Sequence, residues 1–223
     1  MSTSNSTGQQ FPIVLGGKSF VLRADGSLYD ADTNSLLVAD LHLGKDASFR
    51  QAGLPVPAGM VHSILDALET AVCETGAQRL IVLGDLIHNR ASFRDELRTE
   101  FSEWRSRTSV GDVILVEGNH DRHVARFPAD WGLVIESQLL ESDIRYVHQT
   151  SESAKDQRFE IGGHLHPVVK LSDKVDRLRL RCFVLDKHRL ILPAFGIFKG
   201  GLTMKPIASR QFFPIAENEI WKC

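Results

Sequence analysis

Three apolar runs alternate with two helical segments in the first half of the chain, and this order constrains the fold more than any other feature. In the segment 57–74 the apolar residues recur at helical spacing and form one stripe. Strands separated by helices predict βαβ units and a sheet that is at least partly parallel, in an α/β fold. The strands are expected at Ser35–Ala39, Arg79–Leu83 and Val113–Val116, and the helices at Pro57–Glu74 and Ser92–Thr108.

A polar side chain that can bind a metal follows each of these strands. Asp40 and His42 follow the first strand, Gly84 and Asp85 follow the second, and Gly118-Asn119-His120-Asp121 follows the third. In open α/β sheets, ligands bind beyond the carboxyl ends of the strands. These side chains are therefore expected to lie at one edge of the sheet.

After residue 131 the pattern changes to shorter strands that also end in histidines. Ile144–His148 is one expected strand, and Gly163-His164-Leu165-His166 follows another, Phe159–Ile161. Alternate residues of an extended segment point the same way, so His164 and His166 would present both imidazoles on one side. No composition shift marks a linker, so residues 11–223 are expected to form one domain after a disordered N-terminus at residues 1–10.

Together these turns supply nitrogen and oxygen donors for two divalent metal ions. Each motif alone is common by chance, and a single histidine at a strand end is more often a plain polar residue than a ligand. Their joint occurrence, in order and each at a strand end, favours a two-metal site. Donors without thiolate suit Mn²⁺, Fe²⁺ or Zn²⁺. The expected ligands are Asp40, His42, Asp85, Asn119, His148, His164 and His166.

These blocks resemble the calcineurin-like metallophosphoesterase superfamily, whose pattern is Asp-x-His, Gly-Asp, Gly-Asn-His-Asp/Glu, a separate His and then Gly-His-x-His. The resemblance spans residues 40–166 and implies a four-layer αββα sandwich, with two sheets between helices. His123 is the alternative to His148 as the separate histidine, although it lies close to the turn at Asn119. By the resemblance, the first ion would be bound by Asp40, His42 and His166, the second by Asn119, His148 and His164, and both by Asp85.

The implied chemistry is hydrolysis of a phosphodiester bond. Two ions that share Asp85 would lower the pKa of a bridging water, and the resulting hydroxide would attack phosphorus in line. His120 is the candidate general acid for the departing alkoxide, because it stands beside a ligand without being needed as one. Asp121 has two open interpretations, since it could orient His120 or stabilise the turn.

Two departures from the phosphoprotein phosphatases of the superfamily resemble its double-strand-break repair nucleases. The second block reads Gly84-Asp85-Leu86-Ile87-His88, and the third block ends in Asp121 where those phosphatases have glutamate. The resemblance places His88 near the general acid and the scissile phosphate. The alternative for His88 is a hydrogen bond that supports another side chain of the site.

Residues 192–201, Leu-Pro-Ala-Phe-Gly-Ile-Phe-Lys-Gly-Gly, resemble a signature of the compact bacterial ligase-associated DNA damage response endonucleases. With Asp-Leu-His-Leu-Gly-Lys at residues 40–45, that match covers most of the chain. Lys199 stands where family members usually have a small polar residue, and the glycines are also ordinary turn formers. The resemblance implies Mn²⁺ as the metal, DNA as the substrate, and a DNA ligase and a helicase of DNA repair as partners.

The composition indicates where the protein works in the cell more clearly than it indicates the substrate. A net charge of −2 gives no overall basic footprint for nucleic acid, so support must be local. Arg177, Arg179 and Arg181 alternate with leucines and share one face of an expected strand, which is either a phosphate-contacting surface or a solvated face. Three scattered cysteines, no apolar leader and no membrane-length apolar run lead us to expect a cytoplasmic protein without membrane contact.

Two other functions stay open at this point. A small-molecule or nucleotide phosphatase or phosphodiesterase would use the same ligands, and a substrate panel of monoesters and diesters would separate it from a nuclease. A non-catalytic scaffold that binds partner proteins is a different class of protein. Such scaffolds usually lose ligands or the general acid, and this chain keeps both, so an enzyme is the expectation.

Overall fold

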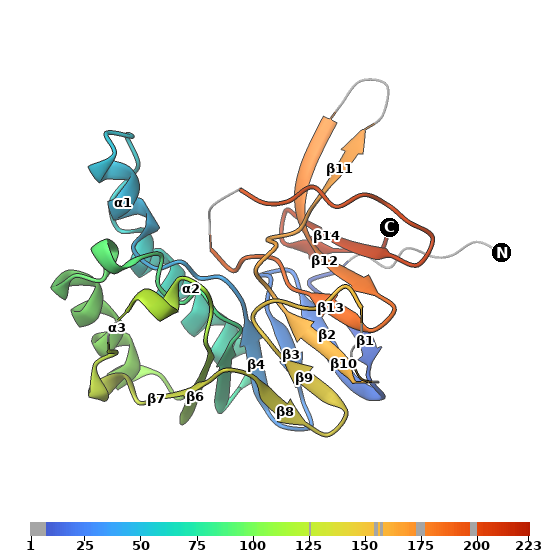
Figure 1. The fold of residues 1–223 in the computed structure, drawn as a ribbon, viewed down its shortest axis with the longest axis horizontal. Coiled ribbons are helices and arrows are strands. Elements are labelled where there is room, and N and C mark those ends of the chain that lie inside the picture. The colour runs from blue at the N-terminus through green and yellow to red at the C-terminus, as the bar shows by residue number, and fades with distance from the viewer. Residues whose placement is uncertain (1–7, 125, 154–155, 157, 173–176, 197–199) are drawn as a thin grey trace.

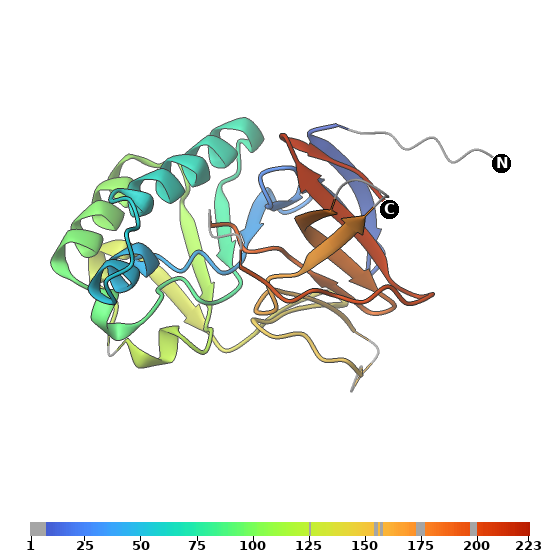
Figure 2. The same cartoon turned by 90° about the horizontal axis from the view of Figure 1, so that it is seen from above.

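The computed structural model describes residues 8–124, 126–153, 156, 158–172, 177–196 and 200–223. Two sheets pack face to face, and the α-helices lie on one side of the pair (Figures 1 and 2). The mixed α/β sandwich predicted from the sequence is confirmed. The helices are α1 (Lys45–Gln51), α2 (Met60–Thr75) and α3 (Asp95–Arg107), with short 3-10 helices η1 (Arg90–Ser92), η2 (Asp121–His123) and η3 (Ala129–Trp131).

The first sheet has seven strands in chain order, so each strand lies next to the one before it. β1 to β4 form an antiparallel meander, and β4 to β7 are parallel. Parallel strands bring their carboxyl ends to one edge, as the βαβ order predicts. The strands are β1 (Gln10–Leu15), β2 (Lys18–Arg23), β3 (Leu28–Asp30), β4 (Ser35–Val38), β5 (Arg79–Val82), β6 (Asp112–Val116) and β7 (Leu133–Glu136).

Among the described residues, the second sheet has eight strands, all from the later half of the chain. β10 lies between β9 and β13 and is parallel to both, while β12 is antiparallel to β11, β13 and β14. The strands are β8 (Leu139–Glu141), β9 (Ile144–Tyr146), β10 (Phe159–Gly162), β11 (Val168–Ser172), β12 (Arg177–Asp186), β13 (Arg189–Ile191), β14 (Gln211–Ala216) and β15 (Glu219–Ile220).

The parallel strands β4 and β5 are buried on both faces because each face meets a different layer. On β4, Leu36 and Val38 belong to the core under the helices, whereas Leu37 belongs to the core between the two sheets. This alternation is the period-two geometry of a strand. Ile161 of β10 and Phe213 of β14 complete the inter-sheet core from the second sheet. Burying a large apolar side chain in this way stabilises the fold by about 1.5–3 kcal/mol.

The helix α2 covers the first sheet through the apolar stripe predicted from the sequence. Its buried residues include all members of that stripe, and α3 buries Leu97, Phe101 and Trp104 on the same side. The Trp104 indole donates a 2.9 Å hydrogen bond to the Glu69 carboxylate, which satisfies its one polar atom. Within the described residues, no helix has the length and apolar character needed to cross a membrane.

The structure differs from the sequence prediction at several boundaries. The second helix begins at Asp95, because Ser92 forms a capping box with Asn89 and belongs to η1. The helix α1 was not predicted. Gln10 begins β1 and Gly8 pairs with Ile220, so the fold includes the last part of the segment predicted to be disordered, while residues 1–7 lie outside the described residues.

The fourth layer of the predicted αββα sandwich is built without a helix in the part of the chain that the structure describes. All described helices precede residue 132. Strand β11 and the loop residue Met204 instead cover the outer face of the second sheet, where they pack on Cys182, Val184 and Phe212. The segment 150–157 is polar in sequence, which predicts a mobile loop, and it falls partly outside the described residues.

Candidate metal centre

Turns from both sheets meet at one edge of the sandwich. Asp40 and His42 follow β4, Asp85 follows β5, and Asn119 follows β6. The second sheet contributes His148 beyond β9 and the His164–His166 turn beyond β10. The structure brings all seven expected ligands together, as the distances below show, because parallel strands in both sheets end here.

The first cluster consists of Asp40, His42 and His166, one donor atom of each lying within 4.8 Å of the others. His166 Nε2 is 3.3 Å from Asp40 Oδ1 and 3.2 Å from His42 Nε2. Burial, together with the nearby charges of His166 and Lys45, lowers the pKa of His42 to about 2. A neutral imidazole with an available lone pair is the form that binds a metal.

The second cluster consists of Asp85, His148 and His164, within the same 4.8 Å limit. His148 Nε2 lies 3.0 Å from His164 Nδ1, 3.0 Å from Asn119 Oδ1 and 3.5 Å from Asp85 Oδ1. On the other side of its ring, His148 Nδ1 donates a 2.9 Å hydrogen bond to the Leu83 carbonyl. That bond fixes the tautomer and aims Nε2, as a lone-pair donor, into the cluster.

Asp85 lies between the two clusters. Its Oδ1 faces His148 of the second cluster, and its Oδ2 lies 3.7 Å from His42 Nε2 of the first. The carboxylate also accepts a 3.0 Å hydrogen bond from the backbone N–H of His120. One carboxylate with an oxygen toward each cluster has the arrangement needed to be shared by two cations.

The donor atoms of these clusters fit cations and do not satisfy one another. Asp40 Oδ1 is buried without a hydrogen bond among the described residues, and His42 Nε2 faces His166 Nε2. Unpaired buried acceptors are costly, so such a set needs positive charge between them. The backbone that holds these donors is also strained, because left-handed conformations of non-glycine residues cost roughly 1–3 kcal/mol each. Five of the expected ligands adopt them: Asp40, His42, Asp85, His164 and His166.

Glycine at position 84 leaves room for a ligand. A Cβ built on Gly84 would lie 2.2 Å from His148 Nδ1, and the residue has a φ of +80°. Both observations exclude an ordinary side chain here. The Gly-Asp pair at the end of β5 therefore serves both sheets, because Asp85 supplies a carboxylate and Gly84 admits the histidine of the opposite sheet.

His88 and His120 stand beside the first cluster. One ring nitrogen of each lies within 4.8 Å of the His42 nitrogen, and the two rings stack with centroids 5.5 Å apart. The His120 Nδ1–H donates to the backbone carbonyl of His88, and its Nε2 lies 3.9 Å from Asp85 Oδ2. Burial lowers the pKa of His88 to about 4, and the charges of Lys45 and His120 act in the same direction.

Asp121 braces the turn rather than the ring of His120. Its carboxylate accepts hydrogen bonds from the backbone N–H groups of Gly118 at 3.0 Å and Ile87 at 3.1 Å. Among the described residues, no hydrogen bond or ion pair joins its carboxylate to the His120 ring. Burial raises the pKa of Asp121 to about 6, and the two amide hydrogen bonds oppose that rise. Of the two interpretations of Asp121, the geometry supports stabilisation of the turn.

Sequence reasoning missed the contribution of α1 to the rim of the site. Lys45 opens this helix, and burial lowers the pKa of its ammonium while Asp40 raises it. The Phe49 ring lies 6.5 Å from the ring of His88. Lys45 ends the Asp-Leu-His-Leu-Gly-Lys match, which was the available signal. The alternative ligand His123 is exposed and belongs to none of the three donor groups found in the described residues.

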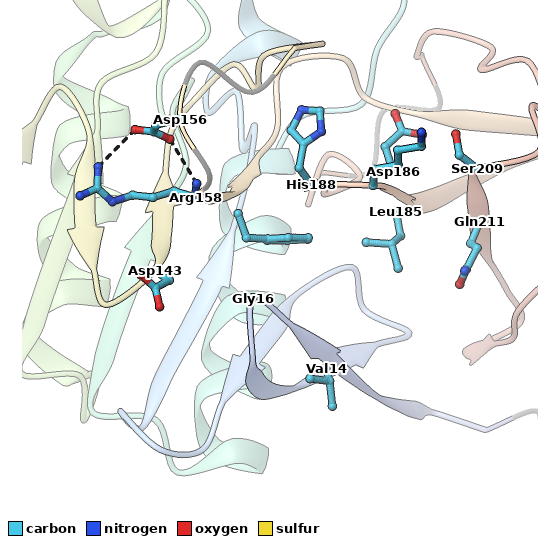
Figure 3. Close-up of a pocket in the computed structure, with 12 residues that line it drawn as sticks. Val14, Gly16, Asp143, Asp156, Arg158, Leu185, Asp186, His188, Ser209 and Gln211 are labelled. Carbon is cyan, nitrogen blue, oxygen red and sulfur yellow. Dashed lines mark hydrogen bonds and ion pairs between the residues drawn. The ribbon is translucent and has the colours of Figure 1, made fainter.

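A cavity of about 900 Å³ lies at the end of the second sheet that is opposite the metal centre (Figure 3). Phe159, which begins β10, lines it, whereas His164 and His166 of the metal centre follow the end of β10. Two of its three acidic side chains already have partners, because Asp156 pairs with Arg158 at 3.2 Å and Asp186 pairs with Arg189 at 3.0 Å. The lining contains none of the expected ligands, so the chemistry belongs to the opposite edge.

Comparison with known proteins agrees with the site. The model of the calcineurin-like phosphoesterase family matches residues 34–207. The crystal structure of the Pseudomonas putida nuclease MPE is similar, with a TM-score of 0.82 and 31% identity over 96% of this chain and 100% of that one. The E. coli phosphoesterase Yfce is more distant, with a TM-score of 0.39 and 17% identity over 82% of this chain and 88% of that one.

No curated protein matches the chain in sequence. The family model nevertheless spans every expected ligand, and the similar nuclease structure extends over nearly the whole chain. The chain therefore belongs to the calcineurin-like phosphoesterase family and is a metal-dependent phosphoesterase.

Proposed function

We propose that the protein is a two-metal phosphodiesterase that hydrolyses DNA. The observation that carries the proposal is the position of Asp85, with one carboxylate oxygen toward each cluster. In this proposal the first ion is held by Asp40, His42 and His166 and the second by Asn119, His148 and His164, with Asp85 shared. Mn²⁺ is the proposed metal because the donors are nitrogen and oxygen without thiolate and because the family resemblance implies it.

The bound ions would supply a nucleophile near neutral pH and positive charge against the phosphoryl oxygens. The protein's own part is to fix the geometry. His148 is locked by its bond to the Leu83 carbonyl, and the His164 backbone N–H donates a 2.8 Å hydrogen bond to Asp40 Oδ2, which holds that carboxylate in place. Rigid ligands of this kind keep the reacting groups aligned without reorganisation during the reaction.

His120 is the proposed general acid. Because its Nδ1–H donates to the His88 carbonyl, the second ring nitrogen, Nε2, is left to hold the proton for the leaving oxygen. The ring is about one-third exposed, at 34%, so substrate can reach it. His88 stacks on this ring and would limit its movement, and in this proposal it lies beside the scissile phosphate.

DNA is the proposed substrate for two reasons. The similar structure from Pseudomonas putida is that of a nuclease, and its likeness extends over 96% of this chain. The sequence also has His88 and Asp121 at the positions where the repair nucleases of the superfamily differ from its protein phosphatases. A role in DNA repair, beside a DNA ligase and a helicase in the cytoplasm, follows from the sequence resemblance and completes the proposal.

The test is hydrolysis by the purified protein with Mn²⁺. We expect cleavage of bis-p-nitrophenyl phosphate and of DNA, and loss of both activities in Asp85→Ala. p-Nitrophenyl phosphate is the monoester comparison, and faster hydrolysis of it would favour a phosphatase over a phosphodiesterase. Absence of activity toward either diester in the wild-type protein loaded with two ions would refute the proposal. Binding of fewer than two ions per chain would instead favour a non-catalytic scaffold.

A further inference from the structure

A groove of about 520 Å³ opens directly beside the metal centre. Helix α2 forms one wall, and strands β12 and β14 of the second sheet form the other. Its volume falls within the roughly 300–1,000 Å³ of small-molecule pockets. The residues that decide its character are Ile64, His166, Arg179, Arg181, Phe195 and Ile215.

The segment at residues 192–201 attaches this groove to the ligands. The Phe195 backbone N–H donates a 2.9 Å hydrogen bond to the carbonyl of Ala39, the residue before Asp40. Gly201 passes so close to the other ligand turn that a Cβ built on it would lie 2.0 Å from the His166 carbonyl oxygen. The described part of the segment therefore connects the floor of the groove to ligands from both sheets, and residues 197–199, including Lys199, lie outside the described residues.

The walls of the groove combine apolar surface with two guanidinium groups. Phe195, Ile64 and Ile215 provide the apolar surface, and Arg179 and Arg181 enter from β12. The register of β11 with β12 places both arginines on one strand face, because they are two residues apart. Among the described residues, the one hydrogen bond of Arg181 is to the carbonyl of Ala24, at 3.2 Å, which leaves further N–H donors on its guanidinium.

Two carboxylates also line the groove. Burial lowers the pKa of Arg181, and the charge of Asp25 opposes that effect. Asp25 is already paired with Arg23 at 2.8 Å and accepts a 2.7 Å hydrogen bond from the Ser27 backbone N–H. Glu217 lies on the exposed turn between β14 and β15, at the rim. A groove with apolar walls and arginine at one side suits a nucleotide. Aromatic and apolar side chains can pack against its base, and arginine can bind its phosphate.

We propose that this groove binds the nucleotide next to the scissile phosphate, on the side of His166. The base lies against Phe195 and Ile64, and Arg181 contacts the phosphate that follows. This inference rests on the proposed function, since it assigns one nucleotide of the DNA substrate to this groove. It also gives a role to the described part of the segment at residues 192–201, which contains none of the expected metal ligands. A substrate as small as bis-p-nitrophenyl phosphate reaches the metal centre without filling the groove.

The test narrows the groove without touching a ligand. Ala67 lies on its lip, on the exposed face of α2, so Ala67→Phe would fill the opening and leave the core unchanged. Cys73→Phe is the matched control, because Cys73 is exposed on the same helix and does not line the groove. We expect kcat/KM for an oligonucleotide to fall about tenfold or more in Ala67→Phe and to stay unchanged in Cys73→Phe. Hydrolysis of bis-p-nitrophenyl phosphate should be equal in both variants and the wild type.

Arg181→Gln provides a second measurement with the same two substrates. Loss of one phosphate contact should lower the dependence of log kcat/KM for the oligonucleotide on log salt by about one unit of slope, with bis-p-nitrophenyl phosphate unaffected. If the wild type cleaves DNA while Ala67→Phe matches Cys73→Phe and Arg181→Gln keeps the wild-type slope, the groove is not a nucleotide site. If the wild type cleaves the small diester and no oligonucleotide, the proposed function fails instead.

Discussion

Replacing Asp85 by asparagine should remove the stabilising effect of metal ions without destabilising the metal-free protein. The Asp85 side chain is 3% exposed, and its carboxylate accepts a hydrogen bond from the His120 backbone N–H. An asparagine oxygen can accept the same bond, so we expect the metal-free variant to unfold within about 1 kcal/mol of the metal-free wild type. What the variant loses is the anionic oxygen that faces each cluster.

The magnitude follows from binding linkage. At a free Mn²⁺ concentration of about 100 Kd, one site stabilises the folded protein by about 2.7 kcal/mol. For a chain of this size each kcal/mol raises the Tm by roughly 2–4 °C, so one occupied site should raise the Tm by about 5–11 °C. The proposed ligand assignment gives the wild type two such sites, and in Asp85→Asn both would lose the shared ligand and should give a small fraction of that gain.

Differential scanning calorimetry with Mn²⁺ and with a chelator measures the gain, and isothermal titration calorimetry counts the ions. Asp143→Asn is the control, because Asp143 is exposed and lies at the far end of the second sheet, where it lines the larger cavity. It should keep two ions and the full rise in Tm. If Asp85→Asn also binds two ions and shows the wild-type rise in Tm, Asp85 is not shared between them and our assignment of the ligands is wrong.

Three further predictions follow from single contacts. His120→Ala should lower kcat about 10²- to 10⁴-fold for an oligonucleotide, whose leaving alkoxide needs a proton, and much less for bis-p-nitrophenyl phosphate; equal losses on both substrates would exclude it as the acid. Gly84→Ala should reduce the measured metal stoichiometry, because its Cβ would meet the His148 ring at 2.2 Å, whereas Gly17→Ala, with nothing within 4 Å, should not. Burial raises the pKa of Asp186, but hydrogen bonds from Arg210 and Arg189 outweigh burial and hold that pKa below its usual range. The ionised Asp186 therefore stabilises the fold above about pH 3.8, and this stabilisation disappears as the pH falls through the folded-state pKa. Urea unfolding of Asp186→Asn should therefore show its largest deficit at neutral pH and a shrinking one in acid, and a deficit that is constant with pH would contradict the ion-pair explanation.

The sequence predicted the parts of the fold that repeat a simple period. The apolar stripe of α2 and the strands β4, β5 and β6 follow directly from helical spacing and from short buried runs. The helix α1 was missed because it has only seven residues and buries only Asp46, so no apolar stripe marks it. The start of α3 was predicted too early, at Ser92. In the structure Ser92 forms a capping box with Asn89, which lies three residues before it and outside the expected helix.

The residues of the metal centre could be predicted because their chemistry is local to each turn. Asp-x-His, Gly-Asp and Gly-His-x-His are visible in the chain, and the parallel strands bring their ends together. The groove was not predicted, since its walls come from α2, β12 and β14, and no spacing in the sequence relates Ile64 to Arg181 or Ile215. The register of β12 with its neighbours decides which arginine reaches the groove, and that register is a property of the folded sheet.

Neither of the two clusters of expected ligands is complete within one sheet, and this division has a consequence for how the protein assembles. Asp40 and His42 belong to the first sheet and need His166 from the second, while Asp85 needs His148 and His164. A nascent chain that has formed the first sheet alone lacks His148, His164 and His166, although His42, His88 and His120 already lie together in it. High-affinity metal uptake should therefore coincide with docking of the two sheets and report the last step of folding, and any species in which the sheets separate should release both ions together.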